Sequence, residues 1–537
     1  MLETLDDLKF DNRFTRDLPA DPESDNYCRQ VTGACFSRVK PTKVSNPHLV
    51  AYAWEVAEQL DLSKTVCESK AFVDVFSGNQ LLTGMDPHAT CYGGHQFGTW
   101  AGQLGDGRAI NLGEIINSKG EHFTLQLKGA GLTPYSRDAD GLAVLRSSIR
   151  EFLCSEAMHH LGIPTTRALS LILTGETVVR DMFYNGNYKV EPSAILCRVA
   201  PSFIRFGNFQ IFASRGEFKE LQQLLNYTIT TDFPHLIKNN KPPGKNEYLK
   251  WFEEVCINTA KMIVHWQRVG FVHGVMNTDN MSILGLTIDY GPYGWLEPFN
   301  PRWTPNTSDG AHGRYRYGQQ PEIAHWNLMQ LANAIHPLVE DEEAFKQALN
   351  IYAENFNQGW QSMMAEKLGF KTLKPETDKD LIETLMGLLI EYEVDMTIFY
   401  RKLALLDISQ SIDELTDEQL IEPLIDAWYW FDSVREEYLS RFADWLKKYL
   451  LRLQSENIKQ EEKIKQMNAV NPKYVLRNYL AQLAIEKAEQ GDFSMVNELL
   501  EVMRHPYDEQ PEKEEYAVKR PDWARNKPGC SILSCSS

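Results

Sequence analysis

Four residues of one short segment have the chemistry of a metal–phosphate site. The segment "HGVMNTDNMSILGLTIDYG", residues 273–291, contains His273, Asn280, Asp289 and Gly291. A carboxylate and an amide carbonyl oxygen that a tight hairpin brings together suit Mg²⁺, which prefers hard oxygen ligands and shares them with phosphate oxygens. The segment therefore predicts that Asn280 and Asp289 bind a divalent metal beside a nucleotide.

The spacing of these residues matches the catalytic segment of kinase-like enzymes except at one position. Those enzymes have His-x-Asp-x-x-x-x-Asn followed by Asp-x-Gly, and Val275 stands where their catalytic Asp belongs. Valine cannot accept a proton, so the chain is either an inactive kinase or an enzyme that catalyses a different transfer. Asp279, directly before Asn280, is the candidate proton acceptor. The alternative is that Asp279 only caps the loop.

The other parts of a kinase-like nucleotide site follow in the expected order. "LGDGR" contains Gly105, Gly107 and Arg108, a strand–turn–strand element whose backbone amides could approach a polyphosphate. "LQLKGAG" places Lys128 on a strand, and Glu151 lies on the next predicted helix, within reach of that lysine. Each of these features has an ordinary alternative. The glycines could mark only a turn, Lys128 could point into solvent from a sheet edge, and Glu151 could be solvated.

Two further groups could contact a nucleotide. "CRVAPSFIRFG" carries Arg198 and Arg205 in a short apolar stretch, and guanidinium groups bind phosphate oxygens in pairs of hydrogen bonds. Two such arginines beyond the strand lysine predict phosphate where an ordinary kinase binds none. Asp140 and Gly141 could contact a base or ribose, or could cap the following helix.

The composition excludes several classes of protein. The 537 residues are 43% hydrophobic and 24% charged, as in a globular protein, and Lys plus Arg (55) against Asp plus Glu (73) gives a net charge of −18. Such a chain repels nucleic acid and anionic membranes on average, so we expect neither as a partner. The acidic N-terminus resembles neither a secretory signal nor a transit peptide, and no apolar run is long enough to span a bilayer. We therefore expect a cytoplasmic protein.

The nine cysteines are scattered and odd in number, which favours a reducing compartment over a disulfide framework. They include no Cys-x-x-Cys pair for zinc. Cys530 and Cys535 lie in a C-terminal tail that we expect to be exposed and extended. The tail is either inert or carries a redox-active pair.

The order of elements predicts an α+β fold of two lobes, with nucleotide between a β-rich N-lobe and an α-rich C-lobe. We expect an N-terminal extension over residues 1–85, the N-lobe over 86–200, the helical C-lobe over 201–505 and the tail over 506–537. Apolar residues at helical spacing predict one helix within residues 143–161.

The motifs "GGHQFG", "QLGDGR", "LGIPTTRAL" and the segment 273–291 together resemble the selenoprotein O (YdiU) family. The resemblance runs from about residue 5 into the tail. Cys535 is third from the end, where some eukaryotic members carry selenocysteine. This resemblance implies a kinase-like fold that transfers AMP from ATP to protein hydroxyl groups, or UMP from UTP in bacterial members. It also implies an inverted nucleotide, whose α-phosphate meets the acceptor.

The resemblance also implies a role for each motif residue. Asp279 is the base, Asn280 and Asp289 bind Mg²⁺ or Mn²⁺, and Glu151 holds Lys128. The implied nucleotide contacts are Gly105, Gly107, Arg108, Lys128, Asp140, Gly141, Arg198 and Arg205. The implied partners are proteins with Ser, Thr or Tyr hydroxyls, including redox and stress proteins, and Cys535 is a redox candidate. A kinase that uses Asp279 as a displaced base and a non-catalytic nucleotide-binding redox scaffold remain the alternatives.

Overall fold

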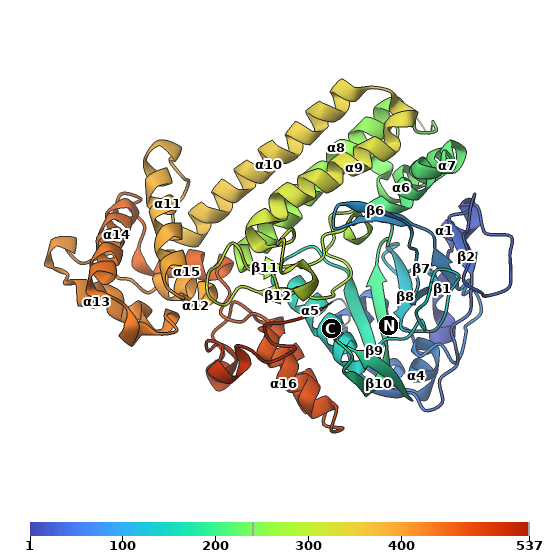
Figure 1. The fold of residues 1–537 in the computed structure, drawn as a ribbon, viewed down its shortest axis with the longest axis horizontal. Coiled ribbons are helices and arrows are strands. Elements are labelled where there is room, and N and C mark those ends of the chain that lie inside the picture. The colour runs from blue at the N-terminus through green and yellow to red at the C-terminus, as the bar shows by residue number, and fades with distance from the viewer. Residues whose placement is uncertain (184, 239–240, 535–537) are drawn as a thin grey trace.

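The N-terminal part of the chain builds one antiparallel sheet. The computed structural model describes residues 1–183, 185–238 and 241–534. The sheet runs in the order β2-β4-β7-β8-β10-β9-β3, and β1 pairs with β7. The strand bounds are β1 Lys9–Phe10, β2 Phe36–Arg38, β3 His48–Tyr52, β4 His88–Thr90, β7 Ala109–Ile116, β8 His122–Lys128, β9 Arg167–Asp181 and β10 Tyr188–Ala200. Figure 1 shows this sheet at one end of the molecule.

Helix α5 packs against the sheet through β9 and β10 and carries Glu151. It spans Leu145–His160, which confirms the helix predicted within residues 143–161. The other N-terminal helices are α1 Arg13–Asp17, α2 Trp54–Gln59, α3 Lys64–Cys67 and α4 Lys70–Phe76. A small hairpin stands apart from the sheet, with bounds β5 Gly93–Gln96 and β6 Thr99–Gln103.

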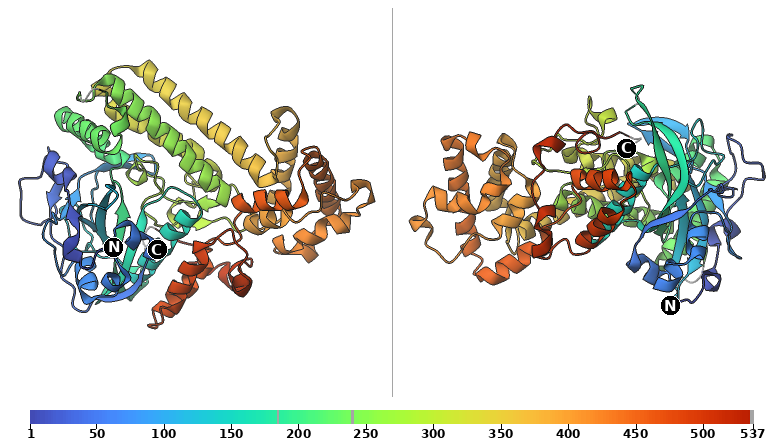
Figure 2. Two further views of the ribbon diagram at one scale, coloured as in Figure 1. Left: turned by 180° about the vertical axis from the view of Figure 1, so that it is seen from behind. Right: turned by 90° about the horizontal axis from the view of Figure 1, so that it is seen from below.

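From residue 206 onward the chain is mainly helical. A group near the sheet contains α6 Phe206–Arg215, α7 Phe218–Asp232, α8 Lys245–Val269, α9 Gln320–Val339 and α10 Glu342–Leu368. A second group, at the far end of the molecule in Figures 1 and 2, has its own hydrophobic core and contains α11 Pro375–Glu391, α12 Met396–Leu403, α13 Asp417–Ile421, α14 Glu436–Gln454 and α15 Gln460–Val470. The chain then returns to pack on α5 with α16 Asn478–Ala488 and α17 Ser494–Arg504.

Short elements complete the helical part. Strands β11 Phe271–Val272 and β12 Gly294–Trp295 pair around the loop that contains Asp279 and Asp289. The 3₁₀ helices are Leu5–Asp7, Pro234–Leu236, Thr278–Asn280, Thr307–Asp309, Tyr317–Gln319, Ile412–Glu414, Glu422–Ala427, Phe431–Ser433, Pro511–Tyr516 and Asp522–Ala524. Within the described ranges, no helix is both long enough and apolar enough to cross a bilayer.

The C-terminal tail differs from the sequence prediction. Its residues through 534 pack on the helical part, where Arg520 pairs with Glu297 at 2.9 Å and Leu533 exchanges backbone hydrogen bonds with residues 305 and 307. Cys530 is buried, and burial raises the pKa of its thiol to about 11, which makes it a poor nucleophile. The prediction that Cys530 lies in an exposed tail was therefore wrong, whereas Cys535 lies outside the described residues.

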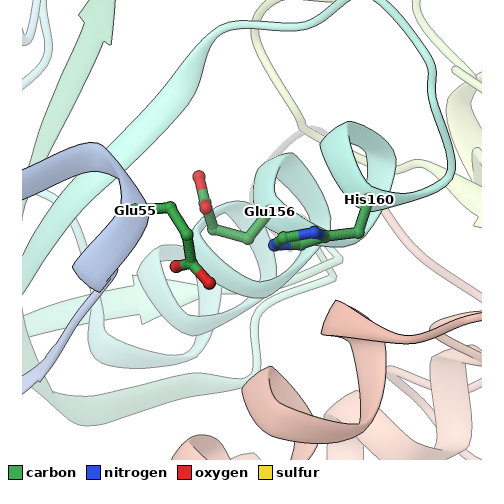
Figure 3. Close-up of side chains that lie close together, drawn as sticks. All are labelled: Glu55, Glu156 and His160. Carbon is green, nitrogen blue, oxygen red and sulfur yellow. The ribbon is translucent and has the colours of Figure 1, made fainter. Parts of the chain in front are cut away.

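Glu55, Glu156 and His160 lie close together between α2 and α5 (Figure 3), with possible ligand atoms within 4.8 Å of one another. Both carboxylates already have cationic partners. Glu156 accepts two hydrogen bonds from Arg167, at 2.9 and 2.6 Å, and Glu55 pairs with Arg504 of α17 at 2.6 Å. A metal would have to displace these arginines, so the cluster is an ion-pair network that fixes α5 against its neighbours.

We expect Glu156→Gln to lower the melting temperature by about 3 to 4 °C, because Arg167 would lose its anion in a buried site. Differential scanning fluorimetry measures the shift. The matched control is Glu383→Gln, which breaks an exposed pair with Lys379 and should change stability little. Equal shifts in the two variants would show that the network does not stabilise the fold.

Candidate active site

A cleft of about 620 Å³ lies between the sheet and the loop of residues 275–291. Most of the predicted site residues line it. They are Gly105, Gly107, Arg108, Lys128, Asp140, Gly141, Arg198, Asp279, Asn280 and Asp289. The other two, Glu151 and Arg205, are buried behind this lining. The structure therefore brings together residues that are up to 184 positions apart in the sequence, counted from Gly105 to Asp289.

Lys128 ends strand β8, and its ammonium group forms an ion pair with Glu151 of α5. The alternative of a lysine that points from a sheet edge into solvent is therefore wrong. Burial lowers the pKa of Lys128 to about 8, although the Glu151 carboxylate opposes this shift. The second oxygen of Glu151 accepts a hydrogen bond from Arg198 at 3.1 Å, so one carboxylate positions two cations at the cleft.

Asp289 is held by both predicted arginines. Arg198 contacts its Oδ1 at 2.6 Å, and Arg205 contacts its Oδ2. Burial alone would raise the pKa of Asp289, but the charges of Arg205, Arg198 and Lys128 outweigh it and hold that pKa well below its usual range. Asp289 also has a φ of 57°, which is rare for a residue other than glycine and is found in strained functional sites. The carboxylate is thus fixed and ionised.

Asp279 lies in the 3₁₀ helix Thr278–Asn280 beneath the β5–β6 hairpin. Its Oδ1 is buried without a hydrogen-bond partner among the described residues, while Oδ2 accepts a hydrogen bond from Gln96 at 3.4 Å. Burial raises the pKa of Asp279 to about 7, against the opposing charge of Arg205. Asp279 belongs to the cleft lining, and a carboxylate whose pKa lies near 7 can accept a proton near neutral pH.

The motif "GGHQFG" is explained by the approach of this hairpin to Asp279. A Cβ atom added to Gly94 would overlap the Asp279 carboxylate, so only glycine fits there. The backbone N–H of His95 donates to the hydroxyl of Thr278 at 2.7 Å, which fixes the hairpin over the loop. These contacts hold Asp279 in one place but leave its Oδ1 unbonded within the described part of the chain.

Asn280 lines the same cleft as Asp289. Its Nδ2 donates to the carbonyl of Val275 at 2.9 Å, which leaves Oδ1 available. The carboxylate of Asp289 also keeps lone pairs beyond its two arginine contacts. An amide oxygen and a fixed carboxylate are the donors that Mg²⁺ or Mn²⁺ prefers, so the residues present fit a divalent metal. His273 does not join these possible metal ligands, because it is buried and its Nε2 forms a hydrogen bond with the carbonyl of Ile288 at 2.8 Å.

Sequence reasoning missed two residues of the site. Gln126 accepts a hydrogen bond from Arg198 and is itself held by Asn111, to which it donates at 3.0 Å. Because side chains alternate along a strand, its position two residues before Lys128 was the available signal. Arg180 of β9 lines the cleft and bonds both oxygens of Asp140 at 2.7 Å. Its contact with Asp140 joins residues 40 positions apart, so the sequence gave no local signal for it.

The cleft brings together cations that suit phosphate oxygens and carboxylates that suit a divalent metal. Comparison with protein families gives a match to the model described as "Protein adenylyltransferase SelO" over residues 24–504. The chain is 59% identical to the "Protein nucleotidyltransferase YdiU" of Rhodopirellula baltica and 54% identical to that of Flavobacterium johnsoniae, each over 99% of this chain and at least 99% of the relative.

The chain therefore belongs to the selenoprotein O family of protein nucleotidyltransferases. Membership makes it a transferase of the EC 2.7.7 class, with ATP as the substrate of an adenylyltransferase and proteins as acceptors. It also implies a kinase-like fold, in agreement with the antiparallel sheet of the N-terminal part and the helices of the C-terminal part. The resemblance recognised from the sequence motifs is thus confirmed.

Proposed function

We propose that the enzyme transfers AMP from ATP to Ser, Thr or Tyr hydroxyls of target proteins, with the α-phosphate facing Asp279. The observation that carries this proposal is the Asp279 carboxylate, which belongs to the cleft lining and has a buried Oδ1 without a hydrogen-bond partner in the described chain, together with Val275 where a kinase has its base. In this arrangement the acceptor oxygen attacks the α-phosphorus and its proton passes to the carboxylate of Asp279. The bond between the α-phosphorus and the bridging oxygen breaks, and pyrophosphate leaves.

The cations of the cleft support an inverted nucleotide between two lobes. Lys128 and Arg198 lie on strands of the sheet and would bind the β- and γ-phosphates. Arg205 donates to the backbone carbonyl of Asp279 at 2.9 Å as well as to Asp289, so it would link the phosphate site to the base. Arg108 lines the same cleft as an exposed cation and would bind the outer phosphates.

The glycine turn and residues 140–141 would complete the nucleotide site. A Cβ on Gly105 would overlap the Tyr135 ring, so this turn requires glycine to pack against the loop that leads to Asp140. Gly107 and Gly141 line the cleft nearby. We place the N-lobe over residues 86–200 and the C-lobe over residues 201–505, in line with the boundaries expected from the sequence.

Asn280 and Asp289 would hold the divalent metal, whose charge, when bound, lowers the repulsion between the phosphates and the attacking oxygen. The chain supplies the rest of the chemistry. Asp289 is kept ionised by its two arginines, and Asp279 is kept in place by the hairpin above it.

Labelled nucleotides test this proposal. With Mg²⁺ or Mn²⁺ and a mixture of candidate proteins, α-labelled ATP should leave label on protein, whereas γ-labelled ATP should leave none. Label from γ alone would identify a kinase that uses Asp279 as its base, and label from neither would identify a scaffold that only binds nucleotide. Competition with UTP, read by mass spectrometry as AMP or UMP adducts, decides which nucleotide is preferred.

A further inference from the structure

Arg314 is a half-buried cation whose guanidinium forms no ion pair with a carboxylate of the described residues, although the chain has a net charge of −18. Its Nε is buried without a hydrogen-bond partner. The nearby carboxylate of Asp309 instead accepts the backbone N–H groups of Arg314 and Tyr315, at 2.9 and 2.7 Å. Among side chains, Tyr315 is a hydrogen-bond partner of Arg314. Four other arginines form no side-chain hydrogen bond in the described chain, but each is exposed to solvent; they are Arg108, Arg137, Arg302 and Arg435. Arg314 is therefore a partly desolvated cation with unused hydrogen-bond donors.

Aromatic rings hold this guanidinium in place. Its Cζ lies 4.7 Å from the ring centroid of Trp326 and 5.8 Å from that of Tyr315, which are distances typical of cation–π contacts. Gly98, in the turn of the β5–β6 hairpin, also packs against it, and a Cβ added there would be 3.3 Å from Cζ. The group is thus fixed before any partner binds, which reduces the entropy lost when a partner does bind.

The same hairpin connects Arg314 to the catalytic loop. Gln96 donates to Asp279 at 3.4 Å, and the next residue, Phe97, donates its backbone N–H to the Tyr315 hydroxyl at 2.9 Å. The Tyr315 hydroxyl donates in turn to Asn277 at 2.6 Å. Arg314 is not part of the cleft lining, whereas Gln96 and Asn277 are. It therefore lies beside the base but outside the space for the nucleotide, where part of an acceptor protein could reach it.

We propose that Arg314 is a specificity-determining residue that binds an acidic side chain of the acceptor protein, close in sequence to the modified hydroxyl. An Asp or Glu would supply the missing anion and pair with the guanidinium through charge-assisted hydrogen bonds. Phe97, which is 41% exposed, and Trp326 would contact apolar parts of the same segment. This inference rests on the function proposed above and adds the class of acceptor sequence to it.

An oriented peptide library tests the inference. Peptides with a central Ser, Thr or Tyr and random flanking residues are incubated with the full-length enzyme, Mg²⁺ and α-labelled ATP. The wild type should prefer Asp or Glu over Asn or Gln at one flanking position by roughly tenfold in kcat/KM. Arg314→Met should remove this preference, and Arg314→Glu should move it to Lys or Arg. As a second measurement, AMP adduct sites are mapped on lysate proteins. Their flanking residues should be acidic for the wild type, without preference for Arg314→Met and basic for Arg314→Glu.

The matched control is Arg316→Met, which removes a nearby arginine that donates to the carbonyl of Gly313 and to Gln319. It should keep the acidic preference. Two results would overturn this inference alone. The first is transfer by the wild type without a preference for acidic residues. The second is an Arg314→Met variant in which the KM for ATP changes and the acidic preference does not. Failure of the wild type to transfer α-label to any peptide or lysate protein would instead overturn the proposed function.

Discussion

Asp289→Ala is expected to reduce AMP transfer by roughly a thousandfold or more, because the variant would lose the proposed metal ligand and loses the anion that pairs with two arginines. Arg198 and Arg205 are both buried, and without Asp289 their charges would repel each other across the site. Binding of ATP should also lose its dependence on the divalent ion. Initial rates with α-labelled ATP, and calorimetric titration of ATP with and without Mg²⁺, measure the two effects.

Loss of stability has to be separated from loss of chemistry in this variant. Asp289→Asn keeps the size of the side chain and should be nearly as inactive as the alanine variant, with a smaller change in melting temperature. The matched control is Asp378→Asn, which breaks another ion pair of a buried aspartate, with Arg452 at 2.9 Å in the distant helical group. That control should be destabilised but active. Activity of Asp289→Asn near that of the wild type would contradict the role assigned to Asp289.

Asp279→Asn is expected to lower kcat by roughly 10²- to 10⁴-fold and to leave the KM for ATP within about threefold of its wild-type value. The amide has the shape of the carboxylate but cannot accept the proton of the acceptor hydroxyl. The hydrogen bond between His95 of the hairpin and Thr278 of the loop does not involve the carboxylate and should persist. Steady-state kinetics with varied ATP and a saturating acceptor provide both constants.

The matched control for Asp279 is Asp232, at the end of α7 and outside the cleft lining. Burial raises the pKa of Asp232 to about 7, as it does for Asp279, so the two carboxyl groups share an electrostatic setting but not a location. Asp232→Asn should leave kcat unchanged. A loss of activity in Asp232→Asn as large as in Asp279→Asn would mean that buried charge, and not proton transfer, limits the reaction.

Local patterns in the sequence were sufficient to predict which residues of the loop 275–291 line the cleft. Asn280 and Asp289 are separated by only nine positions, and both belong to that lining. The alternation of β8 and the length of α5 likewise allowed Lys128 and Glu151 to be paired before the structure was known. The finer roles of these residues still depend on the experiments above.

Contacts between distant segments could not be predicted in this way. Arg205 and Asp289 form an ion pair although they are 84 positions apart, and neither local sequence pattern predicts this contact. The tail was predicted to be exposed because it is rich in proline and charge, yet Leu533 inserts beside residues 305–307. Arg314 escaped notice for the same reason, since its aromatic partner Trp326 belongs to another element and the hairpin beside it is more than 200 residues earlier.

A structure of the enzyme with Mg²⁺ and a non-hydrolysable ATP analogue tests the central claim most directly. The inverted arrangement predicts that the α-phosphorus lies nearest the Asp279 carboxylate, with the β- and γ-phosphates bound by Lys128 and Arg198. If the γ-phosphorus lies beside Asp279 instead and the α-phosphate lies at Lys128, the enzyme is arranged for phosphoryl transfer, and AMP transfer from an inverted nucleotide is contradicted.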